Sequence, residues 1–183
     1  MKLMFASDIH GSAYYAELVR EVFQKKAPDK LVLLGDLLYH GPRNDLPRDY
    51  APKKVIPILN SMKERILCVR GNCDTEVDQM VLEFPIMADY AVLFDSGLTM
   101  YITHGHHLDM LSLINSGDIL IHGHTHVQAM ERQGRIYYIN PGSTSIPKEG
   151  NRPSYMMYEK GVFVIYDLET GEEISRLEIG VRE

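Results

Sequence analysis

The chain has 183 residues, of which 45% are hydrophobic and 24% charged; this is the size and composition of one globular domain, and we expect residues 1–183 to form it. No apolar run approaches the roughly 18 residues that cross a bilayer, and the N-terminus lacks the features of a signal peptide, so we expect a cytoplasmic protein without a membrane partner. The formal net charge of −6 comes without a cluster of Lys and Arg, which argues against binding to a nucleic-acid duplex.

The first third of the chain alternates predicted strands with predicted helices. Three short apolar runs end at polar residues or glycine and predict buried strands. They are residues 2–9, 30–38 and 65–69. Apolar residues recur at helical spacing in residues 12–26, where Ser12 suits an N-cap, and in residues 52–64, where Pro57 marks either the true start of the helix or a kink.

The rest of the chain is mostly predicted strand, with glycine-containing hairpin turns between the runs. The predicted strands are residues 90–94, 99–103, 119–121, 127–133, 135–140, 155–159, 162–167 and 173–179. Short helices are expected at residues 75–83 and 108–114. Strand–helix units followed by hairpins predict an α/β or α+β fold in which two packed sheets have helices outside.

The histidines all lie just after a predicted strand or in the loop beyond it. They are His10, His40, His104, His106, His107, His122, His124 and His126. Ligands and catalytic groups in α/β folds gather at the carboxyl ends of strands. Because imidazole is the commonest metal-binding side chain, the pattern indicates a metal site there.

Five short motifs occur in a fixed order behind these strands. They are Asp8-Ile9-His10, Gly35-Asp36, Gly71-Asn72-Cys73-Asp74, His104-Gly105-His106 and Gly123-His124-Thr125-His126. One such motif is a weak signal, but five in order are a strong one. Their order resembles the signature of the calcineurin-like metallophosphoesterase superfamily, and the segments 36–44, 70–74 and 140–143 look most like the small bacterial YfcE-type phosphodiesterases. The resemblance implies a two-sheet β-sandwich flanked by helices.

The resemblance also implies two divalent metal ions. It assigns Asp8, His10, Asp36 and His126 to the first ion, and Asp36, Asn72, His104 and His124 to the second. Mixed oxygen and nitrogen donors suit a borderline metal, and we expect Mn²⁺, with Fe²⁺, Ni²⁺ and Zn²⁺ as alternatives. Two such ions together with the carboxylates of Asp8 and Asp36 would have a net local charge of about +2, which would attract a phosphate. Ions roughly 3.5–4 Å apart can clamp an in-line displacement by a bridging hydroxide, and Asp36 can bridge them because a carboxylate can donate both oxygens.

Cys73 departs from the family pattern, in which most members have a histidine that is thought to help the leaving group. A thiol with a reference pKa near 8.5 is a poorer proton donor than an imidazole. We expect Cys73 to face the site beside Asn72 and to take part in catalysis; the alternative is a small apolar filler. Asp74 is expected to be the N-cap of the helix that follows it, with no direct metal contact.

The segment after Asp36 carries three further polar residues, His40, Arg43 and Asn44. This loop could fold over the metal ions, with Arg43 and Asn44 binding phosphate and His40 supplying a proton to the leaving group. The alternative is a structured turn made by Gly41 and Pro42.

Other polar residues near the motifs have smaller expected roles. His106 is expected behind the ligands, and His107 and His122 are not expected to bind metal. Residues 140–143 either pack behind the site or form a tight turn between strands.

These residues favour a phosphodiesterase that acts on a small phosphodiester substrate. A phosphomonoesterase of the same fold is the first alternative, although a short chain has little material for a cap over a protein substrate. A non-catalytic scaffold, of which a eukaryotic retromer subunit is an example, is the second, but no ligand position is missing here. A homodimer or homotetramer is compatible with the sequence.

Overall fold

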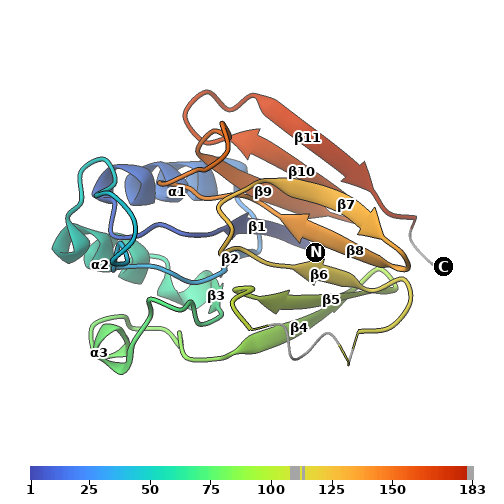
Figure 1. The fold of residues 1–183 in the computed structure, drawn as a ribbon, viewed down its shortest axis with the longest axis horizontal. Helices are drawn as coiled ribbons and strands as arrows, with labels where there is room; N and C mark the ends of the chain where they lie inside the picture. The colour runs from blue at the N-terminus through green and yellow to red at the C-terminus, as the bar shows by residue number, and fades with distance from the viewer. Residues whose placement is uncertain (108–111, 113, 181–183) are drawn as a thin grey trace.

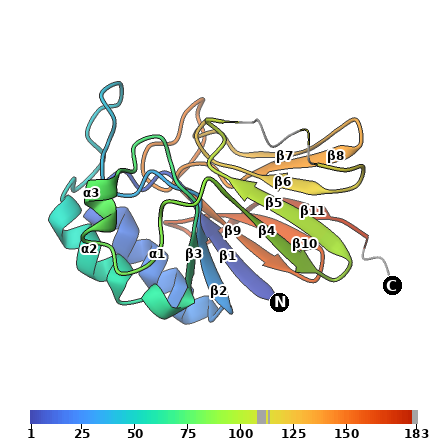
Figure 2. The ribbon, with the colours of Figure 1, turned by 90° about the horizontal axis from the view of Figure 1, so that it is seen from below.

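The computed structural model describes residues 1–107, 112 and 114–180, so residues 108–111 and 113 of the helix expected at residues 108–114 lie outside the described residues. Two β-sheets pack face to face, and helices cover the outer face of one of them (Figures 1 and 2). The helices are α1 (Ala13–Lys26), α2 (Pro52–Asn60), α3 (Glu76–Gln79) and a 3₁₀ turn at Lys63–Arg65. The strands are β1 (Lys2–Ala6), β2 (Lys30–Leu33), β3 (Ile66–Cys68), β4 (Tyr90–Asp95), β5 (Leu98–Thr103), β6 (Ile119–Ile121), β7 (Ala129–Gln133), β8 (Ile136–Asn140), β9 (Ser154–Glu159), β10 (Val162–Asp167) and β11 (Glu173–Glu178). The predicted two-sheet sandwich is confirmed.

Both sheets are mixed. The first has the strand order β11-β10-β9-β1-β2-β3, with β1, β2 and β3 parallel and the other pairs antiparallel. The second has the order β4-β5-β6-β8-β7, with β5, β6 and β8 parallel. Parallel strands place their carboxyl ends at one edge of a sheet, so the loops that carry the sequence motifs start from the same side of each sheet.

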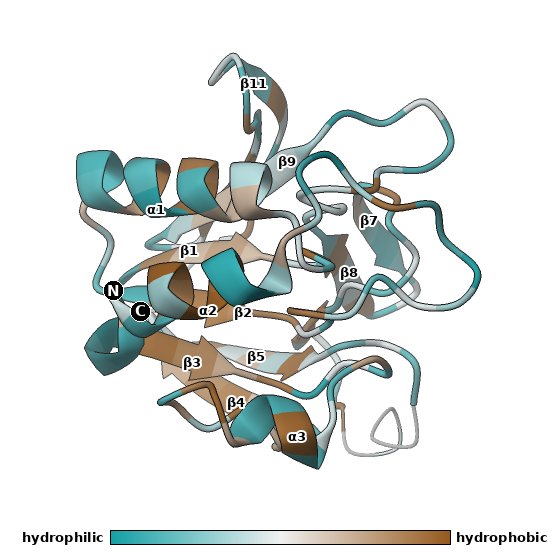
Figure 3. Cartoon of the chain, turned by 90° about the vertical axis from the view of Figure 1, so that its left-hand side faces the viewer, coloured by the Kyte–Doolittle hydropathy of each residue, from teal (hydrophilic) through white to brown (hydrophobic). Residues whose placement is uncertain are grey.

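The alternation of side chains along the central strands supplies two cores. In β1, Leu3 and Phe5 pack between the two sheets, whereas Met4 and Ala6 pack against the helices. A strand that is buried on both faces has to be apolar throughout, which is why it reads as a continuous hydrophobic run. Figure 3 shows β1, β2 and β3 as largely hydrophobic beside helix α1, which is mainly hydrophilic on the side that faces the viewer.

The two longer helices begin where the sequence predicts. Ser12 is the N-cap of α1, and its Oγ accepts a hydrogen bond from the Tyr15 amide at 3.3 Å. Helix α2 starts at Pro52, where a proline costs no hydrogen bond, and it continues through Pro57. No helix in the described part of the chain is long and apolar enough to cross a membrane.

Strands β1 and β2 end at least three residues earlier than predicted, because the residues that follow them hydrogen-bond to each other instead of extending the sheet. Strand β1 ends at Ala6 and not at residue 9, and β2 ends at Leu33 and not at residue 38. Beyond them, the Asp8 amide donates to the Gly35 carbonyl at 3.1 Å and the His10 amide to the Asp36 carbonyl at 2.9 Å. The two loops are thereby fixed side by side.

Candidate metal centre

The backbone is strained where the predicted ligands sit. Five of them have φ in the left-handed region: Asp8 (56°), His10 (49°), Asp36 (57°), His124 (66°) and His126 (62°). This conformation is unfavourable for residues with a side chain, and such strain clusters at functional sites. The surrounding hydrogen bonds must therefore hold these loops in place.

A first group of donor atoms gathers around Asp8. Its Oδ1 lies 3.6 Å from Nε2 of His10 and 3.3 Å from Nε2 of His126. Its Oδ2 accepts from the Ser7 hydroxyl at 2.6 Å and from the His124 amide at 3.2 Å, while Oδ1 is buried without a hydrogen-bond partner. A buried, unpartnered carboxylate oxygen is costly, and a cation would satisfy it.

A second group gathers around His104. Its Nε2 lies 3.4 Å from Oδ2 of Asp36, 3.0 Å from Oδ1 of Asn72 and 3.2 Å from Nδ1 of His124. Among the described residues, the sets Asp8, His10 and His126 and Asp8, Asp36 and His104 each offer donor atoms within 4.8 Å of one another.

Asp36 lies between the two groups and faces both with one oxygen. Its Oδ2 is 3.6 Å from Nε2 of His10 and 3.4 Å from Nε2 of His104. Its Oδ1 accepts a hydrogen bond from the Cys73 amide at 2.8 Å. The sequence suggested that both oxygens would serve the metals; the geometry instead presents a single shared oxygen, because the other one is held by the backbone.

Three imidazoles are oriented in the same way. The Nδ1 atoms of His10, His104 and His126 each donate to a backbone carbonyl at 2.7 Å, on Tyr39, Leu34 and Ile146 respectively. A hydrogen bond at Nδ1 fixes the tautomer and leaves the Nε2 lone pair facing the centre, which is the usual arrangement of a metal-binding histidine. The donor set and its orientation therefore fit divalent metal ions.

The electrostatics of this cluster favour positive charge. Burial alone would raise the pKa of Asp8, but the imidazoles of His10 and His126 hold it well below its usual range. Burial likewise would raise the pKa of Asp36, and His104 lowers it. Burial by itself would lower the pKa of His104, but the effect of the Asp36 carboxylate is larger and raises that pKa to about 9. Burial would also lower the pKa of His10, and the Asp8 carboxylate raises it above its usual value. Metal ions would take the place of these protons.

Two motif glycines make room for the carboxylates. A Cβ at Gly71 would lie 2.1 Å from Oδ1 of Asp36, and a Cβ at Gly123 would lie 2.0 Å from the Ser7 hydroxyl and 2.9 Å from Oδ2 of Asp8. Both contacts are closer than atoms can approach. Glycine is therefore required at these positions because the chain passes against the side chains of the cluster.

Asp74 does not have the predicted position at a helix N-terminus. Thr75 is the N-cap of α3. The buried Asp74 carboxylate instead accepts from the amides of Asp36, Leu37 and Gly71 at 2.8, 2.9 and 2.7 Å. The prediction of an N-cap was wrong because the Asp74 carboxylate turns to Gly71 on its own loop and to two amides on another loop, 37 and 38 residues away in the chain.

Residues 140–146 pack behind the centre, one of the two roles considered from the sequence. The hydroxyls of Ser143 and Ser145 each donate to the Asp8 carbonyl at 2.9 Å. The Asn140 amide donates to the Gly123 carbonyl at 2.8 Å. This segment therefore supports both strained loops at the centre, one from each sheet.

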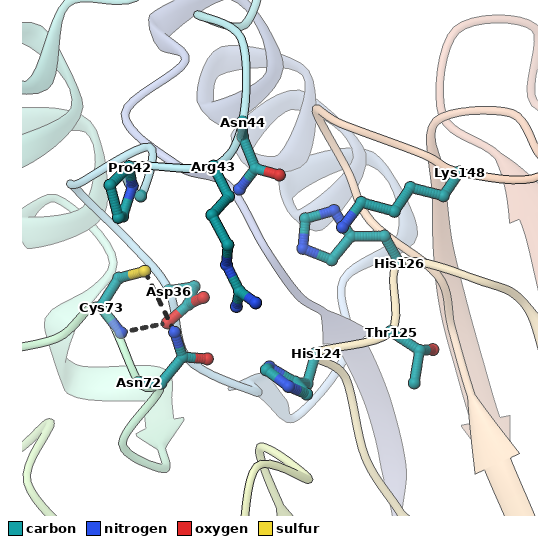
Figure 4. A pocket seen from close by; sticks show the side chains of 11 residues that line it. Asp36, Pro42, Arg43, Asn44, Asn72, Cys73, His124, Thr125, His126 and Lys148 are labelled. Atoms are coloured by element: carbon teal, nitrogen blue, oxygen red, sulfur yellow. Dashed lines mark hydrogen bonds between the residues drawn. The ribbon is translucent and has the colours of Figure 1, made fainter.

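A pocket of about 430 Å³ opens beside the centre (Figure 4). It is lined by Asp36, Gly41, Pro42, Arg43, Asn44, Asn72, Cys73, His124, Thr125, His126 and Lys148. Arg43 and Cys73 are thus where the sequence predicted, whereas Thr125 and Lys148 were not anticipated. The side-chain amide of Asn44 donates to the His40 carbonyl at 2.8 Å, so this nitrogen stabilises the loop.

His40 lies away from the lining of this pocket. Its ring packs edge-on against Tyr39 and Tyr50, with ring centroids 4.8 and 5.1 Å apart. Its Nδ1 is buried and has no hydrogen-bond partner among the described residues. The proton-donating role proposed for His40 from the sequence stays a prediction.

Cys73 is half-buried and reaches the edge of the cluster. Burial and the neighbouring Asp36 carboxylate raise the pKa of its thiol to about 12, so the neutral form is favoured. Its Sγ accepts from the Asn72 amide at 3.3 Å and belongs to a set with His10 and Asp36 whose donor atoms lie within 4.8 Å of one another. The side chain therefore faces the site, as the sequence predicted; its catalytic role stays a prediction.

The remaining histidines surround the second group of donors. The His106 ring packs against that of His104, with centroids 5.3 Å apart. His122 directs Nδ1 to the Gly123 carbonyl at 3.1 Å and lies near the Asn140 amide. His107 contacts the His106 ring. None of the three belongs to the sets of potential metal ligands found in the described residues.

Comparison with known proteins agrees with this architecture. Residues 1–160 match the calcineurin-like phosphoesterase superfamily domain. The chain is 46% identical over 181 residues to phosphodiesterase YfcE of Escherichia coli (strain K12), covering 98% of both chains, and 27% identical over 164 residues to phosphodiesterase MJ0936 of Methanocaldococcus jannaschii, covering 82% of this chain and 91% of that one.

Solved structures show the same similarity. The structure of the Escherichia coli phosphoesterase Yfce superposes with a TM-score of 0.94 at 46% identity, over 98% of this chain and 100% of that one. Vps29 of Entamoeba histolytica shares the fold alone, with a TM-score of 0.68 at 20% identity over 98% of this chain and 100% of that one. The chain therefore belongs to the calcineurin-like phosphoesterase superfamily.

Proposed function

We propose that this protein is a phosphodiesterase that uses two divalent metal ions. The observation that carries the proposal is the pair of donor groups that share one oxygen of Asp36, 3.6 Å from His10 Nε2 and 3.4 Å from His104 Nε2. Support for diesters as substrates comes from the relatives named phosphodiesterases, one of them 46% identical over nearly the whole chain.

We propose that the residues divide between the two ions as the family resemblance implies. Asp8, His10, Asp36 and His126 would hold the first ion, and Asp36, Asn72, His104 and His124 the second. Two bound ions would supply Lewis acidity and would lower the pKa of a water molecule, which could then serve as the nucleophile of an in-line displacement. We propose Mn²⁺ as the metal, with Fe²⁺, Ni²⁺ and Zn²⁺ as alternatives, because mixed nitrogen and oxygen donors suit all four.

The other residues of the pocket would bind and orient the substrate. Arg43 points toward Asp36 and Asn72 (Figure 4), where its guanidinium can hold a non-bridging phosphate oxygen. Asn44 shapes this loop through the His40 carbonyl. Cys73, whose thiol stays protonated and lines the pocket, would assist the leaving group, and His40 is the alternative proton donor.

The alternatives from the sequence differ in substrate and in activity. A phosphomonoesterase would use the same centre, and a scaffold would need none. We favour an enzyme over a scaffold because donor atoms gather around Asp8, Asp36 and His104, and a diesterase over a monoesterase because the relatives are named phosphodiesterases. We further propose one cytoplasmic domain that acts on a small diester, as a monomer or a homo-oligomer.

A metal and substrate panel tests the proposal. Chelator-treated protein is reconstituted with each of the four metals and assayed with bis(p-nitrophenyl) phosphate and with p-nitrophenyl phosphate. Hydrolysis of the diester that requires metal, exceeds that of the monoester and is lost in Asp36→Asn would support a diesterase. A higher kcat/KM for the monoester would favour the phosphomonoesterase, and no metal-dependent turnover of either ester would favour the scaffold.

A further inference from the structure

The pocket beside the metal centre has cations on two opposing walls. Arg43 extends from one loop, and Lys148 extends from the segment beyond β8, with both side chains directed into the pocket in Figure 4. Among the described residues that line the pocket, Asp36 has the only carboxylate. One oxygen of Asp36 faces His104, a predicted metal ligand, and the other accepts from the Cys73 amide. The pocket outside the centre is therefore cationic, although the whole chain carries a net charge of −6.

The backbone of Lys148 is hydrogen-bonded to that of His126. Its amide donates to the carbonyl of His126 at 3.1 Å. Its own carbonyl accepts from the amide of Asn151 at 3.0 Å and from the Asn151 side chain at 2.7 Å. Because His126 is also a predicted metal ligand, the base of the lysine side chain keeps a fixed place relative to the centre.

Among the described residues, the ammonium group of Lys148 has no ion-pair partner. No carboxylate of the described residues lies within ion-pair distance of it, whereas Lys54 and Lys63 pair with Asp49 and Glu83. The hydroxyl of Thr125 on the same wall accepts from the Asn140 amide at 3.0 Å, so the lysine is the charged group that a ligand meets there. An unpaired cation in a pocket favours an anionic ligand group.

One phosphodiester carries a single negative charge, which the two proposed metal ions and Arg43 would already neutralise. We propose that Lys148 is a specificity-determining residue that binds a second anionic group, a phosphate or a carboxylate, on one ester arm of the substrate. This inference rests on the proposed phosphodiesterase function and narrows its substrate class to diesters with a charged arm.

Three esters with the same leaving group test the inference by kinetics. They are ethyl p-nitrophenyl phosphate and its two analogues in which the ethyl arm ends in a phosphate or in a carboxylate. Wild-type protein should show a kcat/KM about 5- to 20-fold higher for a charged arm, the range of a solvent-screened charge-assisted contact. The preference should fall as salt is added. Whichever charged arm is preferred identifies the anion.

Variants test whether Lys148 causes the preference for esters with a charged arm. Lys148→Gln should bring the ratio of charged to uncharged ester close to one, and Lys148→Arg should keep most of it. Lys53→Gln, at an exposed lysine of α2 outside the pocket, is the matched control and should leave the ratio as in wild type. Equal rates for all three esters in wild type, or a ratio that survives Lys148→Gln, would overturn the inference.

A binding measurement separates this inference from the proposed function. The dissociation constants of ethyl phosphate and 2-phosphoethyl phosphate are measured by calorimetry on the Mn²⁺-loaded protein. Tighter binding of the bisphosphate in wild type, lost in Lys148→Gln, would support the anion site even if no diester were hydrolysed. Equal affinities would overturn it, even if the diesterase activity were confirmed.

Discussion

Replacing Asp74 tests how the fold holds the bridging carboxylate. The Asp74 side chain is 1% exposed and accepts three backbone amides, from Asp36, Leu37 and Gly71, at 2.7–2.9 Å. A buried amide left without an acceptor costs about 1–3 kcal/mol. Three would cost about 3–9 kcal/mol, and water entering the vacated space would offset part of this. We expect Asp74→Ala to lower the free energy of unfolding by about 3–5 kcal/mol.

The same change should weaken metal binding, because two of the three amides fix the Asp36 loop. Asp74→Asn keeps one acceptor oxygen and should fall between wild type and Asp74→Ala. Urea unfolding of chelator-treated protein, followed by circular dichroism, measures the stability, and calorimetric titration with Mn²⁺ measures the affinity.

The matched control is Asp78→Ala. Asp78 accepts from the Thr75 amide at 2.8 Å at the exposed start of α3, so its loss should cost about 0.5–2 kcal/mol without changing Mn²⁺ affinity. An Asp74→Ala variant within about 1 kcal/mol of wild type, or one that binds Mn²⁺ as wild type does, would refute the role given to these hydrogen bonds.

Four further predictions concern the centre itself. Asp36→Ala should lose both ions together in metal analysis, since its Oδ2 faces both donor groups; retention of one ion would show that it does not bridge. Arg43→Ala should raise KM with metal content unchanged, and His40→Ala should lower kcat only if its imidazole supplies the proton; unchanged kinetics in both variants would leave this loop a structural turn. Cys73→His should accelerate alkyl diesters selectively, by up to about 10²–10⁴-fold, because aryl leaving groups need little proton donation; parallel plots of log kcat/KM against leaving-group pKa would contradict this. In chelator-treated protein the pKa of His104 is raised from 6.5 to about 9, so its contribution to stability is complete below pH 6.5 and is lost as pH rises to 9. The urea midpoint should fall across that window, and His104→Gln should reduce the fall and leave the part due to His10, whose pKa is also raised.

Much of the fold follows from local patterns in the sequence. Leu3, Met4, Phe5 and Ala6 are all apolar because β1 lies between two cores, and such a run predicts a buried strand wherever it occurs. Ser12 caps α1 through a bond to an amide three residues away, a relation that is visible in the sequence. The exact strand ends could not be read in this way, because they depend on pairing between the loops after β1 and β2.

The candidate ligands were also readable, as residue types in an order that matches a known family. The geometry of these ligands could not be predicted from the sequence, because it depends on contacts between segments that are distant in the chain. Asp74 was predicted to be an N-cap because the sequence shows only that a helix follows it. Its hydrogen-bond donors lie on the Asp36 loop as well as on its own loop. Nothing in the sequence indicated a functional role for Lys148, because a lone lysine in a polar loop is common on any protein surface.

The sequence by itself determined the alternation of apolar residues, the helix starts and the set of side chains that can bind metal, because these depend on neighbours a few residues away. The tertiary structure alone decided that one oxygen of Asp36 faces both donor groups, that Asp74 supports it, and that Lys148 enters the same pocket as Arg43. The physical reason is that these arrangements come from loops on two sheets, whose strained backbones are held by hydrogen bonds between residues far apart in the chain.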